Sequence, residues 1–221
     1  MINKSRFIEE LIREKIKGYI IDAFGSLDQG FFFDSLFKDR FYGREAVPIG
    51  CGESSDEPFA LAKMINYLMP KSGWRILEVG TGSGYSTCLL SMMTSEVVTI
   101  EYNEELAASA KKRFSRLKRN NIRSFVGDGT GLNGLPGEFD AAIILSACQK
   151  RPLSIIDYLK KSGVMVFPMG TVLQQQIAIL KNEHSAAGEG LFATEFKEMC
   201  TFAPIRGQYG ILQPDHSLSG L

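Results

Sequence analysis

Three glycines between a short apolar run and a helical stretch are the residues most suited to chemistry in this sequence. The apolar run covers residues 76–79 and includes Glu78, and Gly80, Gly82 and Gly84 follow it directly. We predict a buried strand, an abrupt turn and a helix. A strand, turn and helix in this order present backbone N–H groups and a helix N-terminus to a closely approaching ligand. Glu78 stands at the end of the predicted strand, just before the turn.

Two classes of cofactor compete for this turn. A dinucleotide site prefers G-x-G-x-x-G, whereas position 85 here is Tyr, and a P-loop is excluded because no Lys-Ser/Thr pair follows. The pattern E-x-G-x-G-x-G resembles the first motif of S-adenosylmethionine-dependent methyltransferases. Glu101 ends the next β-rich run, 96–101, where a carboxylate can accept hydrogen bonds from ribose hydroxyls, although NAD would fit that geometry as well. A glycine turn without a ligand is the structural alternative.

The composition allows one large domain, or a domain with a small appendage. The chain has 221 residues, 44% of them hydrophobic, and its 25 basic and 25 acidic residues give zero net charge. This balance disfavours a nucleic-acid or membrane partner. The four cysteines form no CxxC pair, and we find neither an apolar leader nor a run of membrane-spanning length. We therefore expect a reduced, soluble, cytoplasmic protein.

Alternating strand and helix patterns from residue 75 onward predict an α/β fold, a doubly wound and mainly parallel Rossmann-like sheet. The predicted strands are 75–79, 96–101, 122–126, 140–146 and 163–168, with antiparallel edge strands at 173–180 and 191–202. The predicted helices are 3–24, 29–37, 58–69, 84–94, 103–119 and 152–161. We divide the chain into an N-terminal helical extension with an active-site loop (1–57), a main domain (58–215) and a tail (216–221). The aromatic stretch Phe31–Phe33 is expected to pack against the main sheet, with a lid over the site as the alternative.

Several segments together resemble the protein-L-isoaspartate O-methyltransferase family. Residues 48–52 resemble its P-I-G-x-G loop, 78–85 its E-I-G-T-G-S-G-Y, and 127–129 its third cofactor motif. Residues 161–170 with Gln174 and Gln175 resemble its G-G-x-L-V-x-P-V-G…Q-Q, and 202–210 its closing F-V-P-L-x-G-x-x-G. The matches run in order, at similar spacing, from about residue 30 to 210.

The resemblance implies an S-adenosylmethionine-dependent methyltransferase that repairs isoaspartate in damaged proteins or peptides and yields S-adenosylhomocysteine. It implies that the methionine and ribose end is lined by Glu78, Gly80, Thr81, Gly82, Ser83 and Gly84. Glu101 would hold the ribose hydroxyls, and Asp128 and Gly129 would face the adenine. A carboxylate such as Asp128 can accept from an exocyclic amine, but Asp between two glycines is also a common turn residue.

The chain departs from the family at the residue usually assigned to catalysis. The family loop G-x-G-Q-T-I-S-x-P becomes Gly50-Cys-Gly-Glu-Ser-Ser-Asp-Glu-Pro58, so Asp56 stands in place of the serine. Ser54 and Ser55 are neighbouring hydroxyls that could replace it. An ionised aspartate cannot donate a hydrogen bond, and at about 4 Å it would repel a carboxylate substrate by about 4 kcal/mol.

Three interpretations of Asp56 follow. It could cap the helix that begins near Pro58, as serine would. It could act as a general base for a neutral or cationic acceptor, such as an amine or hydroxyl of an unknown small molecule. Activity could also be lost while cofactor binding persists. A metal site at Glu53, Asp56 and Glu57 is conceivable, but a solvated acidic loop is favoured, so we assign no metal. We assign no role to His184 or His216.

Overall fold

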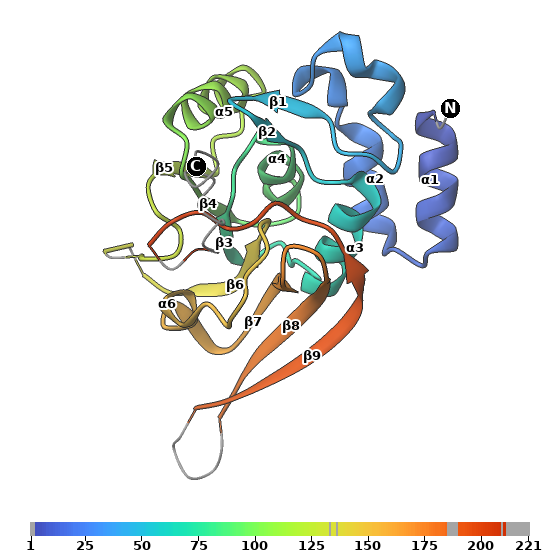
Figure 1. Ribbon diagram of the computed structural model, residues 1–221. Helices are drawn as coiled ribbons and strands as arrows, with labels where there is room; N and C mark the ends of the chain where they lie inside the picture. Colours follow the sequence, from blue (N-terminus) through green and yellow to red (C-terminus); the bar gives the residue numbers. More distant parts are fainter. Residues whose placement is uncertain (1–2, 133, 136, 185–189, 209, 211–221) are drawn as a thin grey trace, which may run out of the picture.

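A seven-stranded sheet with the order β5-β4-β3-β6-β7-β8-β9 forms the centre of the computed structural model (Figure 1). The structure describes residues 3–132, 134–135, 137–184, 190–208 and 210. The strands of this sheet are β3 Arg75–Val79, β4 Glu96–Glu101, β5 Ile122–Val126, β6 Phe139–Ile144, β7 Leu159–Gly170, β8 Gln175–His184 and β9 Gly190–Cys200. A separate hairpin joins β1 Pro48–Gly50 to β2 Glu53–Ser54. The helices are α1 Lys4–Arg13, α2 Gly18–Ser26, α3 Pro58–Leu68, α4 Tyr85–Ser91, α5 Glu104–Arg116 and α6 Leu153–Ile156.

The pairing confirms the predicted doubly wound sheet. Strands β5, β4, β3, β6 and β7 are parallel neighbours, and β8 and β9 add to β7 as antiparallel strands. The parallel strands β3, β4 and β6 are almost wholly buried, as expected for strands covered by helices on both faces. In Figure 1 the β8–β9 hairpin extends well beyond the helical layers.

The helix predicted over 152–161 is wrong in length. Only α6 forms, because β7 already begins at Leu159, which is buried and pairs with Phe139. The strand then passes through an irregularity at Ser162, whose φ is +64°, before regular pairing resumes at Val164. The two lysines in this part of the strand are typical of the polar end of a helix, so the sequence pattern favours a longer helix.

The single helix predicted over 3–24 is two helices. The Lys15 N–H bonds to the Ile12 carbonyl and the Ile16 N–H to the Leu11 carbonyl, with Lys15 at a φ of +58°. These are the two hydrogen bonds of a Schellman motif, which ends α1. Since α1 and α2 both bury their apolar faces, the apolar spacing continues across the break and hides it. The stretch predicted as a helix over 29–37 instead forms two 3₁₀ helices, Gln29–Phe31 and Ser35–Arg40.

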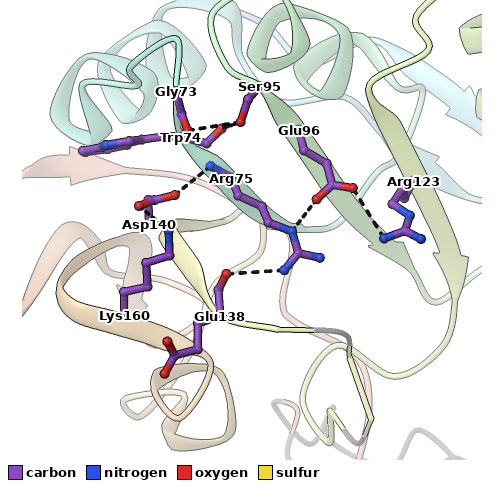
Figure 2. A network of polar contacts seen from close by, with 9 residues as sticks. All are labelled: Gly73, Trp74, Arg75, Ser95, Glu96, Arg123, Glu138, Asp140 and Lys160. Carbon is purple, nitrogen blue, oxygen red and sulfur yellow. Dashed lines mark hydrogen bonds and ion pairs between the residues drawn. The ribbon is translucent and has the colours of Figure 1, made fainter.

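Polar contacts link the amino-terminal ends of several strands of the sheet (Figure 2). The glycine turn after β3 lies at the opposite end of the strands. The Arg75 backbone N–H donates to Asp140 Oδ2 at 2.8 Å, and the Arg75 side chain pairs with Glu96 and with the carbonyl of Glu138. Lys160 pairs with Asp140 at 2.8 Å. These contacts link the starts of strands β3, β4, β6 and β7.

No helix among the described residues is long and apolar enough to cross a membrane. The four cysteines are free thiols. His184 ends β8, and the predicted tail 216–221 with His216 lies outside the described residues.

Candidate active site

The glycine turn after β3 has the backbone geometry that only glycine adopts readily. The φ angles of Gly80, Gly82 and Gly84 are +97°, +52° and +83°. A Cβ on Gly84 would lie 2.6 Å from Cε1 of Phe114, so this glycine also lets α5 pack against the start of α4. A Cβ on Gly82 would lie 3.3 Å from Cδ1 of Ile49 on the β1–β2 hairpin. The turn therefore lies directly beneath that hairpin.

Glu101 lies beside the turn, at the end of β4. Its Oε2 accepts a hydrogen bond from the Gly82 N–H at 2.8 Å, and its Oε1 accepts one from the Asn103 N–H at 2.9 Å. A carboxylate has about four acceptor positions, so each oxygen keeps one for a ligand. The structure thus joins Glu101 to the glycine turn, while its contact with ribose hydroxyls stays a prediction.

Glu78 lies behind the turn instead of in front of it. Its side chain is fully buried, and its Oε2 accepts hydrogen bonds from the hydroxyls of Thr87 and Thr99. Burial raises the pKa of Glu78 to about 7, despite these hydrogen bonds and with a further increase from the negative charge of Glu101. Direct contact of Glu78 with a cofactor stays a prediction. In this structure the hydrogen bonds of Glu78 connect β3 to α4 and β4.

One cavity of about 710 Å³ opens at the carboxyl ends of β3, β4 and β6. From the predicted cofactor site it is lined by Gly80, Thr81, Gly82, Ser83, Glu101 and Gly129. From the predicted catalytic loop it is lined by Ser54, Ser55 and Asp56. The two groups, predicted from separate motifs, therefore face the same space.

The hydroxyl of Ser55 is committed to its own loop. Its Oγ accepts a hydrogen bond from the Val47 N–H at 2.9 Å and donates to the carbonyl of Asp56 at 3.2 Å. The Ser55 N–H donates to the Val47 carbonyl at 2.7 Å, which closes the loop. Ser55 is thus better suited to shaping the loop than to donating to a substrate, while Ser54 on β2 is exposed at the cavity.

Asp56 does not cap α3, so that expectation is wrong. The cap is Glu57, whose carboxylate accepts hydrogen bonds from the N–H groups of Phe59 at 3.1 Å and Ala60 at 2.7 Å. The longer side chain of Glu57 reaches back over the first turn, which leaves Asp56 free to face the cavity. The part of the chain that the structure describes contains no cluster of three or more His, Cys, Asp or Glu residues that could hold a metal ion.

The ionisation of Asp56 is strongly perturbed. Asp56 is partly buried and lines the cavity. Burial, together with the negative charge of Glu78, raises the pKa of its carboxyl group to about 8. The sequence predicts an ionised carboxylate here, which cannot donate a hydrogen bond, whereas the raised pKa favours a protonated carboxyl group, which can.

Asp128 organises the loop on the opposite side of the cavity. Its Oδ1 accepts from the N–H and hydroxyl of Thr130 at 2.7 and 2.6 Å, and its Oδ2 accepts from the Gln208 N–H at 2.6 Å. Burial alone would raise its pKa, but these hydrogen bonds lower it. This is the turn role considered for Asp128; contact with adenine stays a prediction for it and for Gly129, which does line the cavity.

The aromatic stretch after α2 packs against the start of α4. Phe32 and Phe33 contact the ring of Tyr85, with centroids 5.3 and 5.7 Å apart. Phe33 also lines the cavity, whereas Phe31 is partly exposed and lies under Arg116. The stretch therefore packs on Tyr85 at the start of α4, and direct packing on the main sheet stays a prediction.

The sequence motifs missed two residues of the cavity. Gln29 is fully buried and lines the cavity, its Nε2 donates to the Tyr85 hydroxyl at 3.3 Å, and its Oε1 has no partner among the described residues. Arg206 lines the cavity mouth and pairs with Glu53. Arg206 lies inside the segment 202–210 that resembles the family's closing motif, whereas Gln29 lies outside every segment that carries the resemblance.

The doubly wound sheet, the glycine turn and the acidic end of β4 are those of a Rossmann-like methyltransferase. The family model described as protein-L-isoaspartate(D-aspartate) O-methyltransferase matches residues 2–209. A protein-L-isoaspartate O-methyltransferase of Hahella chejuensis is 31% identical over 206 residues, which cover 91% of this chain and 94% of that protein. The chain belongs to the protein-L-isoaspartate(D-aspartate) O-methyltransferase family.

Solved structures agree on the fold. A protein-L-isoaspartate O-methyltransferase structure superposes with a TM-score of 0.81 at 21% identity, covering 94% of this chain and 67% of that one. A Plasmodium falciparum structure described as belonging to the same family, in complex with S-adenosyl-L-homocysteine, gives a TM-score of 0.73 at 21% identity and covers 93% of this chain and 99% of that one.

Proposed function

We propose that this protein transfers the methyl group of S-adenosylmethionine to the carboxylate of isoaspartyl residues in damaged proteins or peptides. The observation that carries the proposal is the single cavity that joins the glycine turn and Glu101 to the Ser54–Asp56 loop. A methyl transfer needs donor and acceptor in one enclosed space, at contact distance. Membership of the family supplies the acceptor class.

The residues present fit S-adenosylmethionine. Glu101 keeps acceptor positions for two ribose hydroxyls, and the unpartnered Oε1 of Gln29 would accept from an ammonium group such as that of the methionine moiety. When bound, the cofactor supplies a methyl group on a positively charged sulfur for in-line transfer. The protein's part is to hold the acceptor carboxylate in line with it and to exclude water.

Asp56, in its protonated form, would take over the role of the family's serine. The acceptor carboxylate is already ionised at neutral pH, so it needs positioning and not deprotonation. A neutral Asp56 donates one hydrogen bond to it and does not repel it. A substrate carboxylate nearby would raise the pKa of Asp56 further, which favours the donor form.

We retain three further statements as proposals. The division at residues 57 and 58 separates the segment that carries the acceptor loop from the one that carries the cofactor turn. The acceptor is a protein or peptide, and nucleic acid is disfavoured by the even charge balance. A cytoplasmic location agrees with the four free cysteines.

The test is methyl transfer from labelled S-adenosylmethionine to an isoaspartyl peptide at pH 7, with the normal aspartyl peptide as control. We expect selective labelling of the isoaspartyl peptide. The variant D56S should keep activity within a few-fold, and D56A should lose about 10- to 100-fold in kcat/KM, the usual cost of a hydrogen bond to a charged group. Calorimetric titration with S-adenosylhomocysteine would identify a fold defect. Cofactor binding without any labelling by the unaltered protein would refute the proposed acceptor.

A further inference from the structure

An ion pair joins two of the residues that line the cavity. Nη2 of Arg206 lies 2.5 Å from Oε1 of Glu53, and both residues line the cavity. The Arg206 side chain is 53% exposed and that of Glu53 is 22% exposed. The pair joins the β1–β2 hairpin to the segment that follows β9, and Figure 1 shows these two segments running across the same end of the sheet.

The family motifs do not account for this pair. Glu53 stands where the motif has glutamine, three residues before Asp56, and Arg206 occupies the unspecified position of the closing motif F-V-P-L-x-G. The quoted motifs therefore specify neither residue of this pair.

The backbone around Arg206 is fixed from both sides. The Ala147 N–H donates to the Ala203 carbonyl at 2.7 Å, and the Ile205 N–H donates to the Ala147 carbonyl at 3.0 Å. On the other side, the Gln208 N–H is held by Asp128 at 2.6 Å. The arginine thus projects from an anchored segment, and Glu53 orients its guanidinium through one nitrogen.

The guanidinium keeps donors for a second anion. Within the part of the chain that the structure describes, the contact with Glu53 is the only ion pair or hydrogen bond of the Arg206 side chain. A guanidinium has five N–H donors in a planar fork that suits a carboxylate. The Nε and Nη1 groups therefore remain available.

The other two cationic side chains that line the cavity form ion pairs with carboxylates of other elements. Arg44 pairs with Glu10 at 3.1 Å and lies 4.0 Å above the ring of Phe59. Lys63 bridges two carboxylates, those of Glu14 and Glu198, at 3.2 Å each. Arg206 is the lining cation attached to the acceptor loop itself.

We propose that Arg206 binds the acceptor carboxylate and that Glu53 positions it for that task. This inference rests on the proposed function, because it concerns the same acceptor. A carboxylate that enters beside Glu53 meets a negative charge, and Arg206 offsets it. Transfer of the methyl group turns the carboxylate into a neutral ester, which no longer holds the guanidinium. Arg206 then returns to Glu53 alone, which favours release of the product.

Because the carboxylate loses its charge during transfer, Arg206 stabilises the bound substrate more than the transition state. Its removal should therefore act on KM and leave kcat unchanged or slightly higher. For R206Q we expect KM for an isoaspartyl peptide to rise about tenfold or more, with kcat within about threefold of the unaltered protein. The matched control is R13Q, which removes an exposed arginine of α1 that does not line the cavity.

A variant in which the charges of residues 53 and 206 are exchanged distinguishes carboxylate binding by Arg206 from a role in closing the cavity. The double variant E53R/R206E can restore an ion pair across the mouth but moves the cation to the other segment. If Arg206 only closes the cavity, the exchange should restore the KM lost in R206Q. Our proposal predicts that KM stays at least about tenfold raised. Recovery of KM in the exchange variant, or an unchanged KM in R206Q, would overturn the inference.

A direct measurement of peptide binding tests this inference separately from the proposed function. We would measure the affinity of a fluorescent isoaspartyl peptide by anisotropy, with S-adenosylhomocysteine saturating. Weaker peptide binding in R206Q supports the inference even if the unaltered protein transfers no methyl group. Turnover by the unaltered protein with equal peptide binding in R206Q and R13Q refutes it while the proposed function stands. A loss of S-adenosylhomocysteine affinity in R206Q with unchanged peptide binding would assign the arginine to the cofactor and also overturn the proposal.

Discussion

The protonation of Asp56 predicts how kcat/KM of this enzyme depends on pH. The pKa of Asp56 is raised to about 8, so about nine-tenths of the group is protonated at pH 7 and about one-tenth at pH 9. If the neutral carboxyl group is the donor to the substrate, kcat/KM should fall about tenfold between pH 7 and pH 9. The sign follows because a raised pKa preserves the donor form below it and loses that form above it.

The perturbation is D56N, which keeps a donor of nearly the same shape but does not titrate. Its kcat/KM should change less than about twofold over the same range. The assay is labelled methyl transfer to an isoaspartyl peptide in a constant-ionic-strength buffer series, with circular dichroism at each pH as a check on folding. Since Glu78 also titrates nearby, the fall is assigned to the interacting pair unless D56N abolishes it.

Two outcomes would refute the reasoning. A flat profile for the unaltered protein up to pH 9 would mean that ionisation of Asp56 does not matter. Activity on another acceptor that rises through pH 8 would show Asp56 acting as a general base, the role considered from the sequence for an amine or hydroxyl acceptor.

Three further predictions concern the surroundings of the cavity. E78Q removes the negative charge that helps to raise the pKa of Asp56, so the alkaline fall in kcat/KM should begin at a lower pH than in the unaltered protein; an unmoved fall would contradict this coupling. G84A should destabilise the fold by about 2–4 kcal/mol in urea unfolding, because the new Cβ meets an α5 ring at 2.6 Å at a φ of +83°, whereas G73A, with open space around it, should change stability by less than about 0.5 kcal/mol. E101Q should weaken S-adenosylhomocysteine binding about tenfold by calorimetry, because an amide cannot accept from two backbone N–H groups and two hydroxyls at once; equal affinity would exclude this carboxylate as a ribose contact.

Local patterns were sufficient for most of the sheet. Strands β3, β4 and β6 are predicted almost to the residue, because buried parallel strands are short apolar runs bounded by turn residues. The break between α1 and α2 was missed because Lys15 adopts a left-handed conformation that its residue type does not announce. Similarly, α6 was predicted too long, because nothing in the sequence shows that Leu159 pairs with Phe139.

The candidate site was predictable as far as it lies in contiguous motifs. The glycine turn, Glu101 and the Ser54–Asp56 loop could be named from the sequence, and the structure brings them to one cavity. Two features depend on tertiary contacts and could not be predicted. The raised pKa of Asp56 needs burial and the approach of Glu78, and the pairing of Arg206 with Glu53 joins distant segments.

The most direct test of the central claim is the location of the transferred methyl group. The unaltered protein would be incubated at pH 7 with S-adenosylmethionine and an isoaspartyl peptide that also carries a normal aspartate, and the product would be fragmented in a mass spectrometer. We predict a gain of one CH₂ on the isoaspartyl residue alone, lost again on mild alkaline hydrolysis as expected for an ester. A methyl group on the normal aspartate, on an amine or on a hydroxyl would contradict the account, as would an unmodified peptide in the presence of a protein that binds the cofactor.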